Sequence, residues 1–188
     1  MAESLENKVC VVTGAARSIG LAIAERYCRD GAKVVMIDIN PEVEEQAKRL
    51  VSEGYKAKAY ILDITEREKV LKVFDEIYNE LGPVFALVNN AGIVDQRPFE
   101  EITPEQMDKI MRVNVSGTLF CTQGAIRGMK ENRRGKIINF SSKSGKTGSA
   151  LMVHYSAAKG AIISLTQALA YELADYNINV NCVCPGIT

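Results

Sequence analysis

The chain has 188 residues, of which 47% are apolar and 24% are charged. This length suits one domain spanning residues 1–188 and is too short for two ordinary ones, and the composition excludes a disordered chain. Lys plus Arg and Asp plus Glu number 23 each, so the formal net charge is zero. That balance gives no electrostatic reason to expect a nucleic acid or an anionic membrane surface as a partner.

Neither the N-terminal residues nor the cysteines suggest export or a metal. The first eight residues are polar, and no apolar run approaches the length needed to span a bilayer, so we expect no targeting segment and no membrane partner. The five cysteines are scattered, odd in number and free of any CxxC motif. The simplest interpretation is a reduced, cytoplasmic protein with no metal site.

Short β-branched runs alternate with longer amphipathic stretches along the chain. The predicted strands are 8–13, 33–38, 56–62, 84–89, 136–140 and 177–184. Apolar residues at helical spacing, and start signals such as Thr103 before Pro104, predict helices between these strands. The predicted helices are 18–30, 41–54, 66–81, 103–131 and 152–175.

Several predicted strands are continuous apolar runs, as in a parallel sheet that is buried on both faces. The chain is therefore predicted to be an α/β protein with a doubly wound parallel sheet, a Rossmann fold whose six strands follow the order 3-2-1-4-5-6. The sequence stops directly after the sixth strand, which would leave an apolar edge. Soluble proteins normally cover or pair such an edge, so we expect the natural protein to continue beyond residue 188.

The first strand runs into a glycine-containing turn, residues 13–20 with the sequence TGAARSIG. Glycines let the backbone turn sharply and approach a pyrophosphate, which then lies at the N-terminus of the next helix. The position between a strand and a helix is the context that such a site requires. A tight strand–helix turn without a ligand is the alternative, since the spacing is not GxGxxG.

Asp38 ends the second predicted strand. A carboxylate there can accept hydrogen bonds from the adenosine ribose of NAD and would repel the extra phosphate of NADP. Arg17 in the glycine turn could instead pair with that phosphate, and Asp38 could simply cap the helix that opens near Pro41. We give Asp38 more weight and expect NAD, with NADP as the alternative.

Two further strand ends carry polar residues. Asp63 follows the third strand, where it could reach the adenine or cap the next helix. The segment 89–92, with the sequence NNAG, follows the fourth strand. Ligands bind outside the carboxyl ends of the strands in open α/β sheets, so this small turn suits the cofactor ribose, although it could also be an ordinary turn.

The candidate catalytic residues are Ser142, Tyr155 and Lys159. Tyr155 and Lys159 are four residues apart and therefore share one face of a helix. An ammonium one turn away favours the phenolate form, so Tyr155 can act as a general acid or base. Ser142 ends the fifth strand, where its hydroxyl can bind the same substrate oxygen. Each residue alone has a purely structural interpretation; the combination favours catalysis.

Together these motifs resemble those of the short-chain dehydrogenase/reductase family. The matching pieces are TGAARSIG at 13–20, Asp38, Asp63, NNAG at 89–92, Asn114, Ser142, YSAAK at 155–159 and PGIT at 185–188. YxxxK alone is common by chance, whereas the ordered set is highly specific and covers the whole chain. The resemblance implies an NAD(P)-dependent oxidoreductase that transfers a hydride between the cofactor and a secondary alcohol or ketone.

The resemblance also implies roles for individual residues. Asn114 would be a fourth catalytic residue that holds a water near Lys159, and Lys159 would bind the nicotinamide ribose. Ile19 would pack near the nicotinamide diphosphate, and Val113 near the adenine. The complete set expected to bind the cofactor is Gly14, Arg17, Ser18, Ile19, Gly20, Asp38, Ile39, Asp63, Ile64, Asn90, Ala91, Gly92, Val113, Tyr155, Lys159, Pro185, Gly186 and Thr188.

Two departures from the family pattern stand out. Ser18 replaces the usual middle glycine of the first turn, and its small side chain is expected to be tolerated. Relatives continue past residue 188 with a substrate-covering helical segment and a seventh strand. The family resemblance further implies a cytoplasmic homotetramer or homodimer, with the long fourth and fifth helices forming one interface.

The substrate is a small molecule whose identity is less well indicated. The residues expected to face it are Val94, Gln96, Ser142, Lys143, Ser144, Lys146, Met152, His154 and Tyr155. The segment 142–146 resembles a stretch of some polyol and sugar-alcohol dehydrogenases, which favours a polyol or sugar-type substrate, although both of its lysines could be solvated. The alternatives are a 3-oxoacyl-thioester (acyl-carrier-protein) reductase and, in another class, a non-catalytic dinucleotide sensor.

Overall fold

A computed structural model describes residues 4–186. Six parallel strands form one sheet in the order β3-β2-β1-β4-β5-β6. The predicted α/β class and the predicted strand order are therefore confirmed. The strands are β1 (Val9–Thr13), β2 (Lys33–Asp38), β3 (Lys56–Ile61), β4 (Val84–Asn89), β5 (Gly135–Phe140) and β6 (Ile178–Val183).

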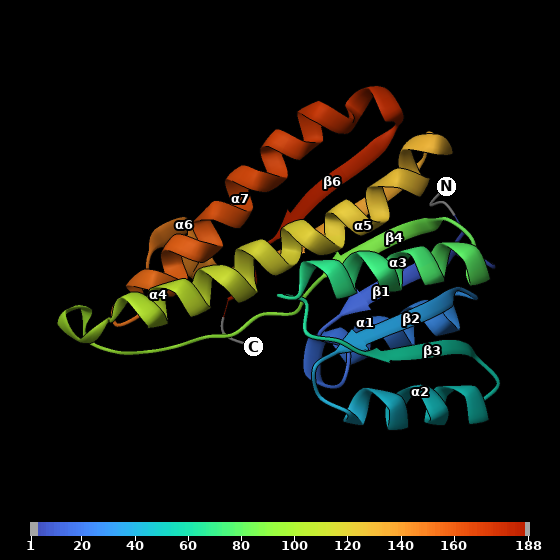
Figure 1. The fold of residues 1–188 in the computed structure, drawn as a ribbon, viewed down its shortest axis with the longest axis horizontal. Coiled ribbons are helices and arrows are strands. Elements are labelled where there is room, and N and C mark those ends of the chain that lie inside the picture. Colours follow the sequence, from blue (N-terminus) through green and yellow to red (C-terminus); the bar gives the residue numbers. More distant parts are fainter. Residues whose placement is uncertain (1–3, 187–188) are drawn as a thin grey trace.

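Helices follow every strand but the last and cover both faces of the sheet (Figure 1). The α-helices are α1 (Ser18–Arg29), α2 (Glu42–Ser52), α3 (Arg67–Leu81), α4 (Pro104–Met111), α5 (Gly117–Glu131), α6 (Lys143–Thr147) and α7 (Val153–Leu173). Short 3-10 helices span Phe99–Glu101 and Ala174–Tyr176. Within residues 4–186, no helix combines the length and the apolarity that crossing a membrane requires.

Two apolar layers hold the helices to the sheet. Because successive strand residues point to opposite faces, Val11 of β1 belongs to the same buried cluster as Phe74 of α3 and Met129 of α5, whereas Val12 belongs to the cluster that includes Leu50 of α2. The strands β1 and β4 are buried along their whole length, as expected for a parallel sheet between two helix layers. These central strands fix the carboxyl edge of the sheet, where the polar candidates gather.

The predicted helix 103–131 is not a single α-helix, and this expectation was wrong in detail. Its start is as predicted, because Thr103 is the N-cap, Pro104 is the first helical residue, and Thr103 forms a capping box with Gln106. A π-helical segment, Arg112–Ser116, then separates α4 from α5. There the Asn114 side-chain amide donates to the Ile110 carbonyl at 3.0 Å, the acceptor that the i→i−4 ladder would otherwise use. The long rod nevertheless continues through this segment (Figure 1).

A short helix that the sequence did not predict, α6, follows β5. Ser142 is its N-cap, and the Ser142 hydroxyl accepts a hydrogen bond from the Ser144 backbone N–H at 3.2 Å. Five residues are too few to show helical periodicity in the sequence, so only the serine cap could have indicated it.

Candidate active site

The carboxyl ends of the central strands border one continuous cleft. Its larger part is a cavity of about 500 Å³ beside β1, β2 and the turn after β4. Its smaller part is a cavity of about 260 Å³ at the start of α7. The two parts share Ile19, Asn90, Gly92 and Ile93 on their walls.

The glycine turn after β1 is fixed by side chains from neighbouring strand ends. The Asn90 side-chain amide donates to the carbonyls of Thr13 and Gly14, both at 3.1 Å. Gly14 has a φ of +66°, and a Cβ on it would lie 2.8 Å from the Asn90 amide nitrogen. A Cβ on Gly20 would lie 2.0 Å from the Gly14 carbonyl oxygen. Glycine is therefore required at both positions. At Gly14 it allows the positive φ, and at Gly20 it allows α1 to pack closely against the turn.

The N-terminus of α1 opens into the larger cavity without a cap of its own. Arg17 is the N-cap and makes no side-chain capping hydrogen bond, and the first turn has no acidic residue. Ser18, the first residue of the helix, has a φ of +50°. Serine thus occupies the left-handed conformation that favours glycine, which is a physical reason for the glycine that the family pattern implies here.

Replacing Ser18 by glycine is expected to stabilise the fold. A left-handed L residue costs roughly 1–2 kcal/mol, and the greater backbone entropy of glycine in the unfolded state offsets part of that. The Ser18 hydroxyl makes no hydrogen bond to any residue within 4–186, so the net gain in unfolding free energy should be about 0.5–1 kcal/mol. Urea unfolding at pH 7 would measure this change. A loss of stability would show that Ser18 makes a contact that outweighs its strain.

The two strand-end carboxylates both border the larger cavity. Asp38 accepts hydrogen bonds from the backbone N–H groups of Ala16 and Asn40, each at 2.9 Å. It therefore ties the glycine turn to the end of β2, and its remaining lone pairs are available for a ligand. Asp63 accepts from the Thr65 backbone N–H at 2.8 Å, as in the capping alternative, although α3 begins later, at Arg67.

Tyr155 and Lys159 lie one helical turn apart on α7 and both line the smaller cavity. The Lys159 ammonium nitrogen is 5.8 Å from the centroid of the Tyr155 ring and donates to the Phe140 carbonyl at 2.8 Å. Lys159 is only 5% exposed. Burial lowers the pKa of its ammonium from 10.5 to about 8. The side chain thus places a cation, or a neutral amine at higher pH, directly beside the phenol.

Asn114 reaches the same point from the π-helical segment. It is 1% exposed, and its amide nitrogen donates to the carbonyls of Ile93 at 2.9 Å and Ile110 at 3.0 Å. Its amide oxygen is buried and has no hydrogen-bond partner within the described part of the chain. A Cβ on Gly92 would lie 2.5 Å from that oxygen and 3.3 Å from the Lys159 nitrogen. Glycine at this position therefore leaves the space between these two polar atoms unfilled by a side chain.

Ser142 lies on the wall of the smaller cavity, two residues after the end of β5. Its hydroxyl oxygen accepts from Ser144, which leaves its proton free to be donated. The neighbouring Ser141 donates to the Lys159 carbonyl at 2.6 Å and so holds α7 against the end of β5. All four candidate catalytic residues, Asn114, Ser142, Tyr155 and Lys159, line this one cavity.

Most of the residues expected to bind a cofactor also line the cleft. Those at its walls are Gly14, Arg17, Ser18, Ile19, Asp38, Ile39, Asp63, Ile64, Asn90, Ala91, Gly92, Val113, Tyr155, Lys159, Pro185 and Gly186. Gly20 lies behind the turn and lines neither cavity. Thr188 lies outside the described residues.

The expected substrate residues are only partly brought together. Val94, Ser142 and Tyr155 line the smaller cavity. Gln96, Lys143, Ser144, Lys146 and Met152 line neither part of the cleft. Lys146 is exposed on α6, which agrees with the alternative that this lysine is solvated and does not face the substrate. His154 points to the other side of α7, since neighbouring residues of a helix face different directions.

Six residues at the cleft were not expected from the sequence: Ile37, Leu62, Ile93, Lys109, Phe140 and Ser141. Most are strand-end or turn neighbours of predicted residues, so their position could have indicated them. Lys109 lies four residues before Val113 on the same helical rod and therefore on the same face. That spacing was a signal that the sequence offered.

Comparisons with known proteins agree with this geometry. A family model described as short chain dehydrogenase matches residues 8–188. Sorbitol dehydrogenase of Cereibacter sphaeroides is 43% identical over 184 residues, which cover 97% of this chain and 71% of that protein. The 3-oxoacyl-[acyl-carrier-protein] reductase of Aquifex aeolicus (strain VF5) is 37% identical over 184 residues, which cover 97% of this chain and 74% of that protein.

Two solved structures share the fold closely. The structure of NAD+-bound xylitol dehydrogenase has a TM-score of 0.94 and 34% identity, and the match covers 98% of this chain and 72% of that one. A gluconate 5-dehydrogenase from Burkholderia cenocepacia J2315, in complex with NADP and tartrate, has a TM-score of 0.93 and 33% identity, covering 97% and 72%. The chain therefore belongs to the short-chain dehydrogenase/reductase family, whose members are oxidoreductases that use a nicotinamide dinucleotide.

Proposed function

We propose that this protein is an NAD-dependent dehydrogenase that interconverts a secondary alcohol of a polyol or sugar-type substrate and the corresponding ketone. The observation that carries the proposal is the continuous cleft, which has a carboxylate for an adenosine ribose at one end and Tyr155 with Lys159 at the other. The shared wall residues connect these ends, as one extended dinucleotide would require.

The residues of the cleft fit such a cofactor. Asp38 would accept from the adenosine ribose hydroxyls, and the uncapped N-terminus of α1 would meet the diphosphate through its free N–H groups. Lys159 would donate to the nicotinamide ribose, and the backbone at Pro185 and Gly186 would border the ring. When bound, the nicotinamide ring accepts or supplies the hydride.

The protein's own contribution is to manage the proton of the substrate oxygen. Tyr155 would exchange that proton, and Ser142 would donate a hydrogen bond to the same oxygen. The Lys159 ammonium stabilises the phenolate electrostatically, because it is buried beside the ring. The unpartnered amide oxygen of Asn114 would accept a hydrogen bond from a water held between it and Lys159, through which the proton would leave.

NAD is the proposed cofactor, because the Asp38 carboxylate borders the ribose end of the cleft. Replacing Asp38 by alanine is expected to weaken NAD binding about tenfold, the usual cost of a hydrogen bond to a charged group, while NADP binding stays equal or strengthens. Alanine also removes the bonds to Ala16 and Asn40, so general damage would weaken both cofactors alike. Dissociation constants for the reduced forms of both cofactors, measured by the fluorescence of the reduced nicotinamide, separate these outcomes, and an unchanged ratio of the two constants would contradict the proposal.

The polyol assignment is supported by the sorbitol and xylitol dehydrogenases among the similar proteins. The thioester reductase is a second candidate, supported by its 37% identity but disfavoured by Asp38 if that enzyme uses NADP. Turnover of NAD and NADP with sorbitol, xylitol, galactitol and a 3-oxoacyl thioester, read by absorbance of the reduced nicotinamide, would decide. Cofactor binding without any turnover would favour the non-catalytic sensor. Homotetramer or homodimer assembly and a cytoplasmic location stay predictions from the family.

A further inference from the structure

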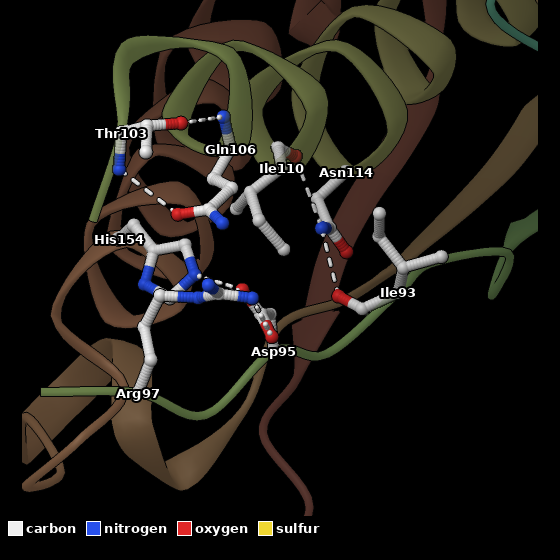
Figure 2. A network of polar contacts seen from close by, with 8 residues as sticks. All are labelled: Ile93, Asp95, Arg97, Thr103, Gln106, Ile110, Asn114 and His154. Carbon is white, nitrogen blue, oxygen red and sulfur yellow. Dashed lines mark hydrogen bonds and ion pairs between the residues drawn. The ribbon is translucent and has the colours of Figure 1, made fainter. Parts of the chain in front are cut away.

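The segment 93–98, which lies after β4, is bonded both to the π-helical segment that carries Asn114 and to α7, which carries Tyr155 and Lys159. At its start, the Ile93 carbonyl accepts from Asn114. Two residues later, the Asp95 carboxylate accepts from Arg97 Nε at 2.6 Å and Nη2 at 3.0 Å. It also bonds His154 Nε2 at 3.0 Å. In Figure 2 the side chains of Arg97 and His154 both point toward the Asp95 carboxylate, and the Asn114 amide points toward the Ile93 carbonyl.

Val94 lies between these two attachment points and lines the smaller cavity beside Tyr155. Its position is therefore determined from both sides, by Asn114 through Ile93 and by His154 through Asp95. A third bond, from the Arg97 backbone N–H to the Leu151 carbonyl at 2.8 Å, ties the same segment to the residues just before α7. Leu151 has a φ of +62°, an unfavourable conformation for leucine, so the surrounding contacts must hold it there.

His154 is the residue directly before Tyr155 in the first turn of α7, and it is 1% exposed. Arg97, and then His154, hold the pKa of the Asp95 carboxyl at about 2, so Asp95 is an anion that accepts a hydrogen bond from His154 Nε2. His154 Nδ1 is buried without a hydrogen-bond partner within residues 4–186. Among the described residues, the bond to Asp95 is thus the polar contact that orients this ring.

We propose that Asp95 and His154 are positioning residues, which hold Val94 as a wall of the substrate end of the cleft at a fixed distance from Tyr155. The inference rests on the proposed function, because it assigns the substrate to the cavity that Val94 and Tyr155 share. The pair acts through the backbone on either side of it, since neither side chain lines that cavity. Arg97 completes the site by donating a hydrogen bond to the second oxygen of the Asp95 carboxylate and balancing its negative charge.

The conformational entropy of the segment 93–98 explains why fixing its position would matter for catalysis and not only for stability. A segment with only its ends attached would sample several backbone states, and substrate binding would then have to order it. A buried histidine bonded to a carboxylate removes that freedom beforehand. Misplacing a binding wall by about 1 Å can lower catalytic efficiency about a hundredfold without touching the reacting groups.

The test compares His154→Leu, His154→Gln and Asp95→Asn with the wild type. Gln can place an amide N–H where His154 Nε2 lies and should restore the bond, whereas Leu fills space without a donor. For the best substrate of the panel, kcat/KM is expected to fall about tenfold to a hundredfold in His154→Leu and about threefold or less in His154→Gln. The dissociation constant for NAD should stay within about twofold in both, since the larger cavity is not involved.

Asp30→Asn is the matched control for loss of an arginine-bound carboxylate. Asp30 accepts from Arg26 Nε at 3.1 and 3.0 Å at the end of α1, and its substitution should leave kcat/KM unchanged. Asp95→Asn should lower kcat/KM as His154→Leu does. Equal kcat/KM in His154→Leu and the wild type, or no rescue by His154→Gln, would overturn the proposal.

A second readout does not depend on turnover. Hydrogen exchange of the Arg97 backbone amide, which bonds the Leu151 carbonyl, should be at least about tenfold faster in His154→Leu, while the amides of β1 and β4 are unaffected. Unchanged exchange at Arg97 would overturn the positioning role even if the protein turned over no substrate. Absence of turnover in the wild type, with accelerated exchange in the variant, would instead overturn only the proposed reaction.

Discussion

Replacing Tyr155 by phenylalanine is expected to lower kcat about 10²- to 10⁴-fold, because the substitution removes the group proposed to exchange a proton with the substrate oxygen. The ring stays, so the packing of α7 is kept. Within residues 4–186 the Tyr155 hydroxyl has no hydrogen-bond partner, and its removal leaves no buried polar atom unpaired. The free energy of unfolding should therefore change by less than about 0.5 kcal/mol.

Steady-state kinetics over a pH series, together with the dissociation constant for NAD, would check this expectation. Tyr171→Phe is the matched control, since Tyr171 lies on the same helix, is 87% exposed and is far from the cleft. Activity within threefold of wild type in Tyr155→Phe would remove the acid/base role. A loss of NAD binding as large as the loss of kcat would show that Tyr155 acts through cofactor binding and not as the acid/base.

The fold was predictable because its local signals agree with its tertiary arrangement. The apolar runs of β1 and β4 are buried on both faces, and the helices between strands carry their apolar residues at helical spacing. Thr103 and Pro104 start α4 as expected, since capping depends on residues close in sequence. Where one polar side chain competes with the backbone, as Asn114 does for the Ile110 carbonyl, the local pattern still indicates an α-helix and the π-helical segment is missed.

The candidate site was predictable to the extent that it lies at strand ends. Asp38, Asn90 and Ser142 follow directly from the rule that parallel strands present their carboxyl ends to one cleft. The substrate side of the cleft was not predictable from the sequence, because its walls come from connecting segments whose direction depends on contacts with residues distant in the chain. Proximity to Ser142 along the chain suggested Lys146, but α6 turns that side chain to solvent. His154 is next to Tyr155 in sequence and faces Asp95.

Replacing Lys159 by methionine is expected to abolish turnover and, at neutral pH, to stabilise the protein. Methionine has a similar length but cannot supply the ammonium beside Tyr155, so a loss of about 10³-fold or more in kcat is expected from the missing electrostatic stabilisation. Burial holds the pKa of Lys159 at about 8, well below its ordinary 10.5. At about 1.36 kcal/mol per pKa, keeping the protonated lysine buried costs about 3 kcal/mol at pH 7.

Loss of the bond to the Phe140 carbonyl offsets about 1–2 kcal/mol of that gain. The variant should therefore be more stable than the wild type by about 1–2 kcal/mol at pH 7. Between about pH 8 and 10.5 the unfolded chain binds more protons at Lys159 than the folded one, so the wild type gains relative stability as the pH rises. The advantage of the variant should shrink across this range and reverse, because the missing bond to Phe140 remains.

Urea unfolding of both proteins at pH 7, 8.5 and 10 measures this difference directly. Taking the difference removes the contributions of other groups, such as Cys10 and Tyr27. These lose their protons in this range only in the unfolded chain, because burial raises their pKa to about 12 in the folded protein. Lys143→Met, at an exposed lysine of α6, is the matched control for replacing a lysine by methionine outside the cleft. A variant that is less stable than the wild type at pH 7 would mean that the buried ammonium is well compensated, and the low pKa assigned to Lys159 would then be wrong.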